Sequence, residues 1–263
     1  MQQVFSSPRL FPPVTKWILV LLLWGTLFFT LAPGMFQVFG WPSPFVLFGV
    51  HPHTISDWSF WQILTYGWTV PASGGFSFGL IFTLLIDLLF IGQLASGLER
   101  KLGSKALLVL WVGGIALGGL VAAGYAWMGW PSREILLIGN RAGTAALIIA
   151  WMMMYSDTPV LFFLAPIRIK WLAIGILAIE WFPVLEAGHF MALSAYVAAA
   201  FGSYLCCLTA WNLSSPFRLF WRFERPFHLL GGYLRRLWAH RRRAPRTVPA
   251  VIIDFKTGKE VRR

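Results

Sequence analysis

The sequence contains few charged residues and especially few acids. Only 12% of its 263 residues are Asp, Glu, Lys or Arg, and only ten residues are acidic. Soluble domains carry about 25% charged residues, whereas this chain is 57% hydrophobic and has a mean hydropathy of +0.67. This composition excludes an ordinary soluble domain and predicts an all-α protein that crosses a membrane several times.

Cysteines and clusters of metal ligands are also scarce. The two cysteines, Cys206 and Cys207, are adjacent, so the sequence offers no disulfide framework. His51 and His53 have the spacing of a ligand pair, but no third ligand stands near them in the sequence. We therefore expect neither a metal site nor a bound cofactor.

Apolar stretches of about 20 residues, the length of a transmembrane helix, recur along the chain. They predict six spans at residues 17–36, 77–98, 106–129, 137–155, 171–185 and 188–210. The long segment between the first two is rich in Trp, Phe and Pro, which predicts short helices in or on the outer leaflet. The predicted domains are a lead at 1–15, a six-helix membrane domain at 16–211 and a tail at 212–263.

Basic residues collect on one side of the predicted membrane domain. Lys16, the cluster from Arg100 to Lys105, and the pair Arg168 and Lys170 all flank spans on that side. The positive-inside rule places this side, and with it both termini, in the cytoplasm. We therefore expect an integral protein of a bacterial inner membrane or an equivalent membrane.

The tail is the most basic part of the chain. It carries 13 of the 22 Lys and Arg, interleaved with aromatic residues and leucines. This pattern predicts one or two amphipathic helices that bind anionic lipid or a cytosolic partner, and no nucleic-acid partner is expected. The final residues, VPAVIIDFKTGKEVRR, predict a β-hairpin that turns at Thr257 and Gly258.

Glycines mark the third span as a packing helix. Gly114 and Gly118 form a GxxxG pair, with further glycines on either side. Small residues at this spacing let two helix backbones approach closely in a membrane. The third span is therefore expected to pack tightly against its neighbours.

Four ionisable side chains lie in or beside the predicted spans: Asp87, Arg141, Glu180 and His189. A charge at a helix centre costs roughly 2.5–3.5 kcal/mol on insertion scales, so such residues usually face a partner inside the protein. We expect a polar core that also includes Asn140, in which Arg141 pairs with Glu180 or Asp87. A path for a proton or small solute through the same groups is the alternative.

Three short motifs, in this order, resemble the rhomboid superfamily of intramembrane proteases. They are Trp61-Gln62-x-x-Thr65, Glu99-x-x-x-Gly103-Ser104, and His189 at the start of the last span. The resemblance implies a six-helix rhomboid-like bundle with a long first outer loop. It also implies a Gly-x-Ser-Gly motif at the head of the fourth span, whose serine attacks the substrate after the histidine takes its proton.

The residues at the catalytic positions depart from that pattern. The fourth span begins Gly139-Asn140-Arg141-Ala142-Gly143, so Ala142 or, in the other alignment, Arg141 takes the place of the serine. Asp87 takes the place of the family's oxyanion-binding asparagine, where a carboxylate would repel the oxyanion. His189 alone matches its catalytic counterpart.

The resemblance therefore implies an inactive member of the superfamily, a pseudoprotease that binds membrane-protein clients or their transmembrane helices. The small residues that follow the family's histidine are replaced by Ala192 and Tyr196, which does not favour close packing of the fourth and sixth spans. Two alternatives stay open: an active rhomboid-type serine protease with a non-standard site, and a transporter of protons or small solutes.

Overall fold

The computed structural model describes residues 11–51, 53–68, 77–130, 136–162, 165–242, 252–253 and 260–261, most of which are helical. The longer helices of the bundle are α1 (Pro13–Val38), α4 (Phe78–Leu102), α5 (Ser104–Trp127), α6 (Arg141–Tyr155), α7 (Ile169–Glu186) and α8 (Phe190–Ala210), and α9 (Trp221–Arg242) follows them. The short helices are α2 (Pro44–Phe48), α3 (Gln62–Thr65), η1 (Tyr66–Trp68) and η2 (Arg218–Phe220).

Two small antiparallel hairpins complete the fold. Strands β1 (Pro159–Phe162) and β2 (Ala165–Arg168) connect α6 to α7, which the sequence does not predict. Strands β3 (Ile252–Ile253) and β4 (Glu260–Val261) pair where the terminal hairpin is expected, while its turn at Thr257 and Gly258 lies outside the described residues.

Within the described residues, four helices are long and apolar enough to cross a membrane: α1, α4, α5 and α8. The protein is therefore an all-α membrane protein, apart from its two small hairpins. Helices α6 and α7 stand where the fourth and fifth spans are expected. Helix α6 has 15 residues, or about 22 Å of length, and α7 carries Lys170, Glu180 and Glu186 in its 18 residues.

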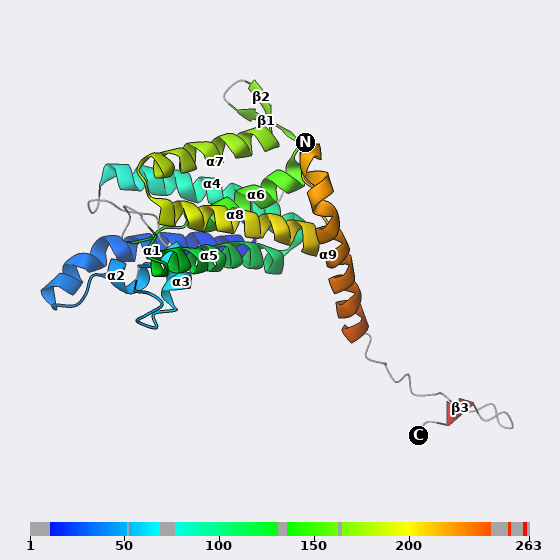
Figure 1. Ribbon diagram of the computed structural model, residues 1–263, viewed down its shortest axis with the longest axis horizontal. Coiled ribbons are helices and arrows are strands. Elements are labelled where there is room, and N and C mark those ends of the chain that lie inside the picture. Colours follow the sequence, from blue (N-terminus) through cyan, green and yellow to red (C-terminus); the bar gives the residue numbers. More distant parts are fainter. Residues whose placement is uncertain are drawn as a thin grey trace.

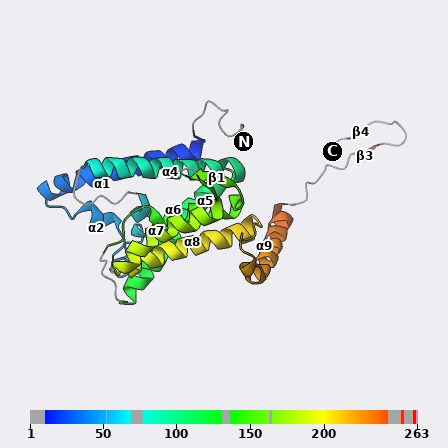
Figure 2. The same ribbon diagram turned by 90° about the horizontal axis from the view of Figure 1, so that it is seen from above.

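Helix α6 is the centre of the bundle, with α4, α5, α7 and α8 packed around it (Figures 1 and 2). Small residues make this packing close, as the GxxxG pair predicts. A Cβ added to Gly114 would stand 2.6 Å from the Cβ of Ala146, and one added to Gly118 would stand 3.0 Å from that of Ala142. The expected close approach of the third span to its neighbours is thus confirmed.

Helix α8 also packs closely on α6, although glycines do not follow His189. Buried alanines, Ala195 and Ala199 among them, serve as the small residues of α8. The Ser203 hydroxyl donates a hydrogen bond of 2.6 Å to the carbonyl oxygen of Ala146. The replacement of glycines by Ala192 and Tyr196 therefore does not loosen this contact.

One end of the bundle, here called the basic end, carries Arg100, Lys101, Lys105, Arg168 and Lys170. A single carboxylate joins three helices there. Glu99, only 5% exposed, accepts hydrogen bonds from the backbone of Val14 and Thr15 in α1 and from the hydroxyls of Thr15 and Ser104.

Gly103 makes this junction sharp, because its φ of +88° lets α5 start directly after α4 ends. The Glu99-x-x-x-Gly103-Ser104 motif is therefore a structural junction. It holds the start of α1 against the turn between α4 and α5.

The opposite end, here called the loop end, contains the aromatic segment with α2 and α3. The side chains of Trp61, Gln62 and Thr65 donate hydrogen bonds to carbonyl oxygens of α2: Trp61 to Leu47 (2.9 Å), Gln62 to Val46 (3.0 Å) and Thr65 to Phe48 (2.9 Å). The Trp61-Gln62-x-x-Thr65 motif thus fastens α3 to α2 and gives the loop a fixed shape.

Candidate functional site at the head of helix α6

The head of α6 is held in place by the loop end. The Gly139 amide donates to the Tyr66 carbonyl oxygen (2.9 Å), and the Tyr66 hydroxyl donates to the Ile115 carbonyl oxygen in α5 (2.9 Å). Gly139 has a φ of +124°, a conformation that favours glycine. Asn140 follows as a buried N-cap residue, whose carbonyl oxygen accepts from the Thr144 amide and hydroxyl.

Ala142 takes the place of the family's serine in one of the two alignments that the resemblance allows, and Arg141 takes it in the other. The Ala142 side chain is fully buried. The point where a Gly118 Cβ would stand is 3.0 Å from the Ala142 Cβ and 3.0 Å from the carbonyl oxygen of Ala195. The methyl group is therefore enclosed at the meeting point of α5, α6 and α8, and it has no nucleophilic atom.

His189, the residue that matches the family's base, is the N-cap residue of α8. Ala195, which reaches the level of Ala142, lies six residues further along, or about 9 Å down the helix axis. In the described part of the chain, no hydrogen bond joins the His189 ring to a serine or threonine hydroxyl. The nearest serine in sequence, Ser194, donates instead to the Met191 carbonyl oxygen (2.8 Å).

Two loop serines, Ser73 and Ser77, precede α4 in the sequence. Ser73 falls outside the described residues. Ser77 caps α4, since its hydroxyl oxygen accepts from the Leu80 amide (3.2 Å). The Ser77 hydroxyl thus caps the helix, and among the described residues no hydrogen bond joins it to the His189 ring.

Arg141, Asp87 and Glu180 lie within electrostatic reach of one another. The Tyr155 hydroxyl donates a hydrogen bond to the carbonyl oxygen of Gly97 (3.3 Å). The last residue of α6 therefore lies at about the level of Gly97 in α4. Counted from that level at 1.5 Å per residue, Arg141 lies about 21 Å and Asp87 about 15 Å toward the loop end. Despite this difference in level, Arg141 interacts electrostatically with both carboxyl groups, whereas His189, the fourth residue of the expected cluster, is not among these interactions.

The three charges are near one another, yet they are not tied together. Among the described residues, no ion pair within 4.0 Å joins Arg141 to either carboxyl group. The Oε2 atom of Glu180 is buried and has no hydrogen-bond partner, and the same is true of Nδ2 of Asn140. The ring of His189, in the same described part, makes no hydrogen bond or ion pair with these groups.

The helices that carry the two carboxyl groups flank α6 on different sides. Asp87 belongs to α4, which packs against α1, and Glu180 belongs to α7, which packs against α8 (Figure 2). Both helices contact α6 but, over the described residues, they hardly contact each other. Arg141, an exposed residue, therefore stands at the head of α6 with one carboxyl group on each flank.

The site also contains a residue that the sequence does not reveal. The indole of Trp111, 1% exposed, lies against α6 at Gly143, where an added Cβ would come within 2.6 Å of Nε1. This Nε1 is buried without a hydrogen-bond partner. The signal in the sequence is a tryptophan in the glycine-rich third span. Such an indole needs a glycine on the facing helix to leave room for it, and Gly143 is that glycine.

The remaining motif residues lie apart from this cluster. Trp61, Gln62 and Thr65 are in the loop, and Glu99 and Ser104 are at the basic end. Within the part of the chain that the structure describes, no group of three His, Cys, Asp or Glu residues is arranged to hold a metal ion. His51 instead accepts a hydrogen bond at Nδ1 from the His53 amide (3.1 Å).

No protein-family model matches the chain, and no curated protein matches it.

Proposed function

We propose that this protein is a rhomboid-like pseudoprotease of a bacterial inner membrane, with both termini in the cytoplasm, that binds transmembrane helices of other membrane proteins. The binding site is the side of α6 that lies between α4 and α7. The buried methyl group of Ala142 carries this proposal, because it fills the position of the nucleophile. In this proposal α6 and α7 are the fourth and fifth of six spans.

The absence of catalysis follows from the chemistry of these residues. An acyl-enzyme needs a hydroxyl or thiol beside a base and donors aimed at the oxyanion. Ala142 supplies no such atom, and Asp87 would present a carboxyl group where a hydrogen-bond donor is needed. Arg141 cannot act as a nucleophile, because its guanidinium stays protonated.

The flanks of the site suit a second membrane helix. Ile86 and Leu89 in α4 and Ile179 and Phe182 in α7 are exposed apolar side chains. In a bilayer, helices associate through packing and interhelical hydrogen bonds rather than through apolar burial alone. The half-buried carboxyl group of Glu180 is therefore the specific element, since rotation of its side chain can bring the unpartnered Oε2 to a donor on a bound helix.

The class of client follows from the unpartnered Oε2 of Glu180. A helix with Ser, Thr, Asn, Gln or a basic residue at the depth of Glu180 satisfies that oxygen, whereas an entirely apolar helix does not. The unsatisfied oxygen costs about 1–3 kcal/mol. We expect a preference of that order for a polar over an apolar helix.

The test uses the full protein in nanodiscs and two synthetic transmembrane peptides, a leucine-rich helix with one central asparagine and the same helix with leucine instead. Fluorescence energy transfer should report binding of the asparagine peptide about tenfold tighter. Glu180→Leu should remove that difference, while Glu186→Leu, at the end of the same helix, should preserve it. Equal binding of both peptides to the natural protein would contradict the proposal.

Transport is the second candidate, and the cluster of Asp87, Arg141 and Glu180 in the membrane domain is the observation that favours it. Ionisable residues at this depth often line proton paths. A proton flux in liposomes that Asp87→Asn abolishes would support transport. We expect no such flux.

A further inference from the structure

Helix α9 crosses the basic end of the bundle, transverse to α8, and extends past it on one side (Figures 1 and 2). Its 22 residues correspond to about 33 Å. Since the bundle helices run across the membrane, a helix transverse to them at their end lies along the membrane surface. This orientation does not depend on the function proposed above.

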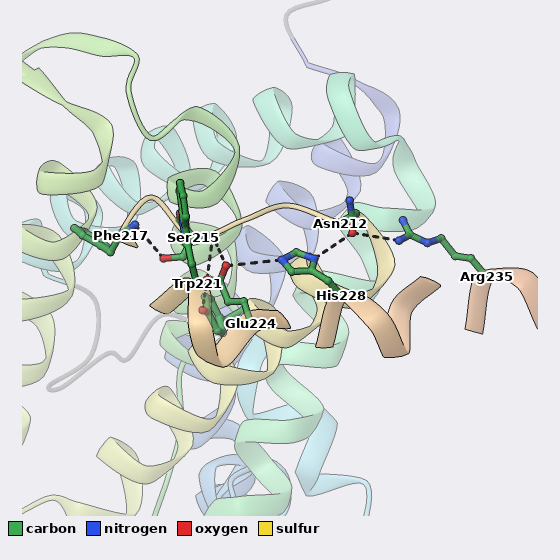
Figure 3. Close-up of polar contacts among 8 residues, drawn as sticks. Asn212, Ser215, Phe217, Trp221, Glu224, His228 and Arg235 are labelled. Carbon is green, nitrogen blue, oxygen red and sulfur yellow. Dashed lines mark hydrogen bonds and ion pairs between the residues drawn. The ribbon is translucent and has the colours of Figure 1, made fainter. Parts of the chain in front are cut away.

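A buried carboxylate sets that orientation (Figure 3). Glu224 of α9 is only 2% exposed. Its Oε1 accepts from the Tyr204 hydroxyl of α8 (2.5 Å), and both of its oxygens accept from the Ser215 amide (3.1 and 3.2 Å). The first turns of α9 are thus fastened to the last turns of α8 and to the connection between them.

Further contacts continue this anchor along α9. The His228 ring lies 3.8 Å from Glu224 through Nε2 and 3.1 Å from the Asn212 side-chain oxygen through Nδ1. Arg235 donates to the same Asn212 oxygen (3.3 Å). Gly231 is buried where α9 meets α8, and an added Cβ would collide with the backbone of Thr209. The helix is therefore held along more than two turns.

The anchored face leaves two other faces free. Phe223, Leu230, Leu234 and Leu237, spaced at intervals of seven, four and three, form one exposed apolar face. Phe223 is 70% exposed. An apolar face of this size on a helix at a membrane surface fits the boundary between headgroups and acyl chains.

Arginines flank this apolar face. Arg222, Arg225 and Arg236 are exposed and share a side of the helix. The one acidic residue of the helix, Glu224, is buried in the anchor. Up to Leu237, where the described side chains end, the free surface of α9 therefore has basic side chains and no acidic one. Guanidinium groups suit phosphate oxygens, which they can bind with two parallel hydrogen bonds.

We propose that α9 is an interfacial helix that binds anionic phospholipid, with the Phe223 to Leu237 face in the bilayer boundary and the three arginines on the headgroup phosphates. Both features are needed, because apolar burial and attraction to anionic headgroups together decide how firmly such a helix is held. An acidic soluble protein would satisfy the arginines but would leave the apolar face in water.

The test compares two single-cysteine variants of the full chain in which Cys206 and Cys207 are replaced by alanine. One carries an environment-sensitive dye at Leu234→Cys, and the other carries it at Arg222→Cys. Both are reconstituted in nanodiscs of phosphatidylcholine with or without phosphatidylglycerol, and quenching by lipid-borne nitroxide is measured. We expect the Leu234 dye to be quenched more strongly than the Arg222 dye, and more strongly when phosphatidylglycerol is present.

A charge-matched pair of variants separates a specific surface from overall charge. Arg222→Gln, Arg225→Gln and Arg236→Gln together should abolish the phosphatidylglycerol effect on the Leu234 dye. Removal of three charges outside α9, by Lys259→Gln, Arg262→Gln and Arg263→Gln, should preserve it. A Leu234 dye that stays in water in both lipids, or an equal loss in both triple variants, would overturn the proposal.

Discussion

Two glutamates in the bundle, Glu99 and Glu180, differ in how far the protein satisfies their carboxylate oxygens with hydrogen bonds. Glu99 at the basic end accepts hydrogen bonds from α1 and α5 on both of its oxygens. Glu180 near the loop end has a buried oxygen without any partner, although Arg141 stands in electrostatic reach. Burial makes an unmade hydrogen bond expensive, so the first carboxylate stabilises the fold. The second does not, and we propose that it recognises a client helix.

Replacement of these two glutamates should give the largest contrast. Glu99→Ala removes the acceptor of the Thr15 amide and of two hydroxyls, so the free energy of unfolding should fall by about 3 kcal/mol or more. Glu180→Leu removes an unsatisfied oxygen and should leave stability unchanged or raise it by about 1 kcal/mol. Unfolding in detergent micelles measures both. Equal losses would show that Glu180 is also a structural residue.

Enlarging a glycine of α5 that packs against the head of α6 should have the next largest effect. A Cβ on Gly118 meets the Tyr66 hydroxyl oxygen at 2.7 Å and Ala142 at 3.0 Å, whereas one on Gly113 meets nothing within 4 Å. Gly118→Ala should therefore cost about 1–3 kcal/mol of stability. Gly113→Ala, on the same helix, is the control and should cost nothing. A harmless Gly118→Ala would contradict the close packing of α5 on α6.

Arg141→Leu should have a smaller effect on folding. A buried ion pair would make this change cost several kcal/mol, because the partner charge would be left alone. Since no ion pair within 4.0 Å holds Arg141 among the described residues, we expect a loss below about 1 kcal/mol. The thermal unfolding midpoint in micelles tests this. A drop of several degrees more than in Arg168→Leu would show that Arg141 clamps the helices.

The smallest effect should be a pH dependence of the stability of the loop. Burial lowers the pKa of His51 below its ordinary value of 6.5, and its Nδ1 accepts from the His53 amide. His51 therefore binds a proton more readily in the unfolded loop than in the folded one. Its contribution to the stability of the loop is present above about pH 6.5 and is lost as the pH falls toward the folded pKa. Hydrogen exchange of residues 53–66, corrected for intrinsic rates, should be slightly faster at low pH. His51→Gln should remove the difference.

The sequence predicts the helical membrane character, the position of each bundle helix and the GxxxG contact well. These depend on hydropathy and on local spacing, which the chain displays directly. The Glu99 and Trp61 motifs are also visible in the sequence, but their hydrogen bonds join residues as much as 85 positions apart. Their role as junctions therefore becomes clear only in three dimensions.

The candidate site is predicted less completely. The clustering of Arg141 with Asp87 and Glu180 follows from depth along each helix, but whether charges pair depends on side-chain distances that spacing does not fix. The sequence does not reveal the role of Trp111, because that role depends on Gly143 of the facing helix. The sequence does not favour close packing of α8 on α6, but buried alanines such as Ala195 and Ala199 are small enough to replace glycines there.

Photocrosslinking at Ile179, an exposed residue of α7 next to Glu180, tests the central claim most directly. Benzoylphenylalanine at this position should capture the asparagine peptide in nanodiscs, and the mass of the adduct should equal that of protein plus the uncut peptide. A crosslink at Leu108 on α5 should be much weaker. Capture of a shortened peptide, or equal capture at both positions, would contradict a helix-binding pseudoprotease.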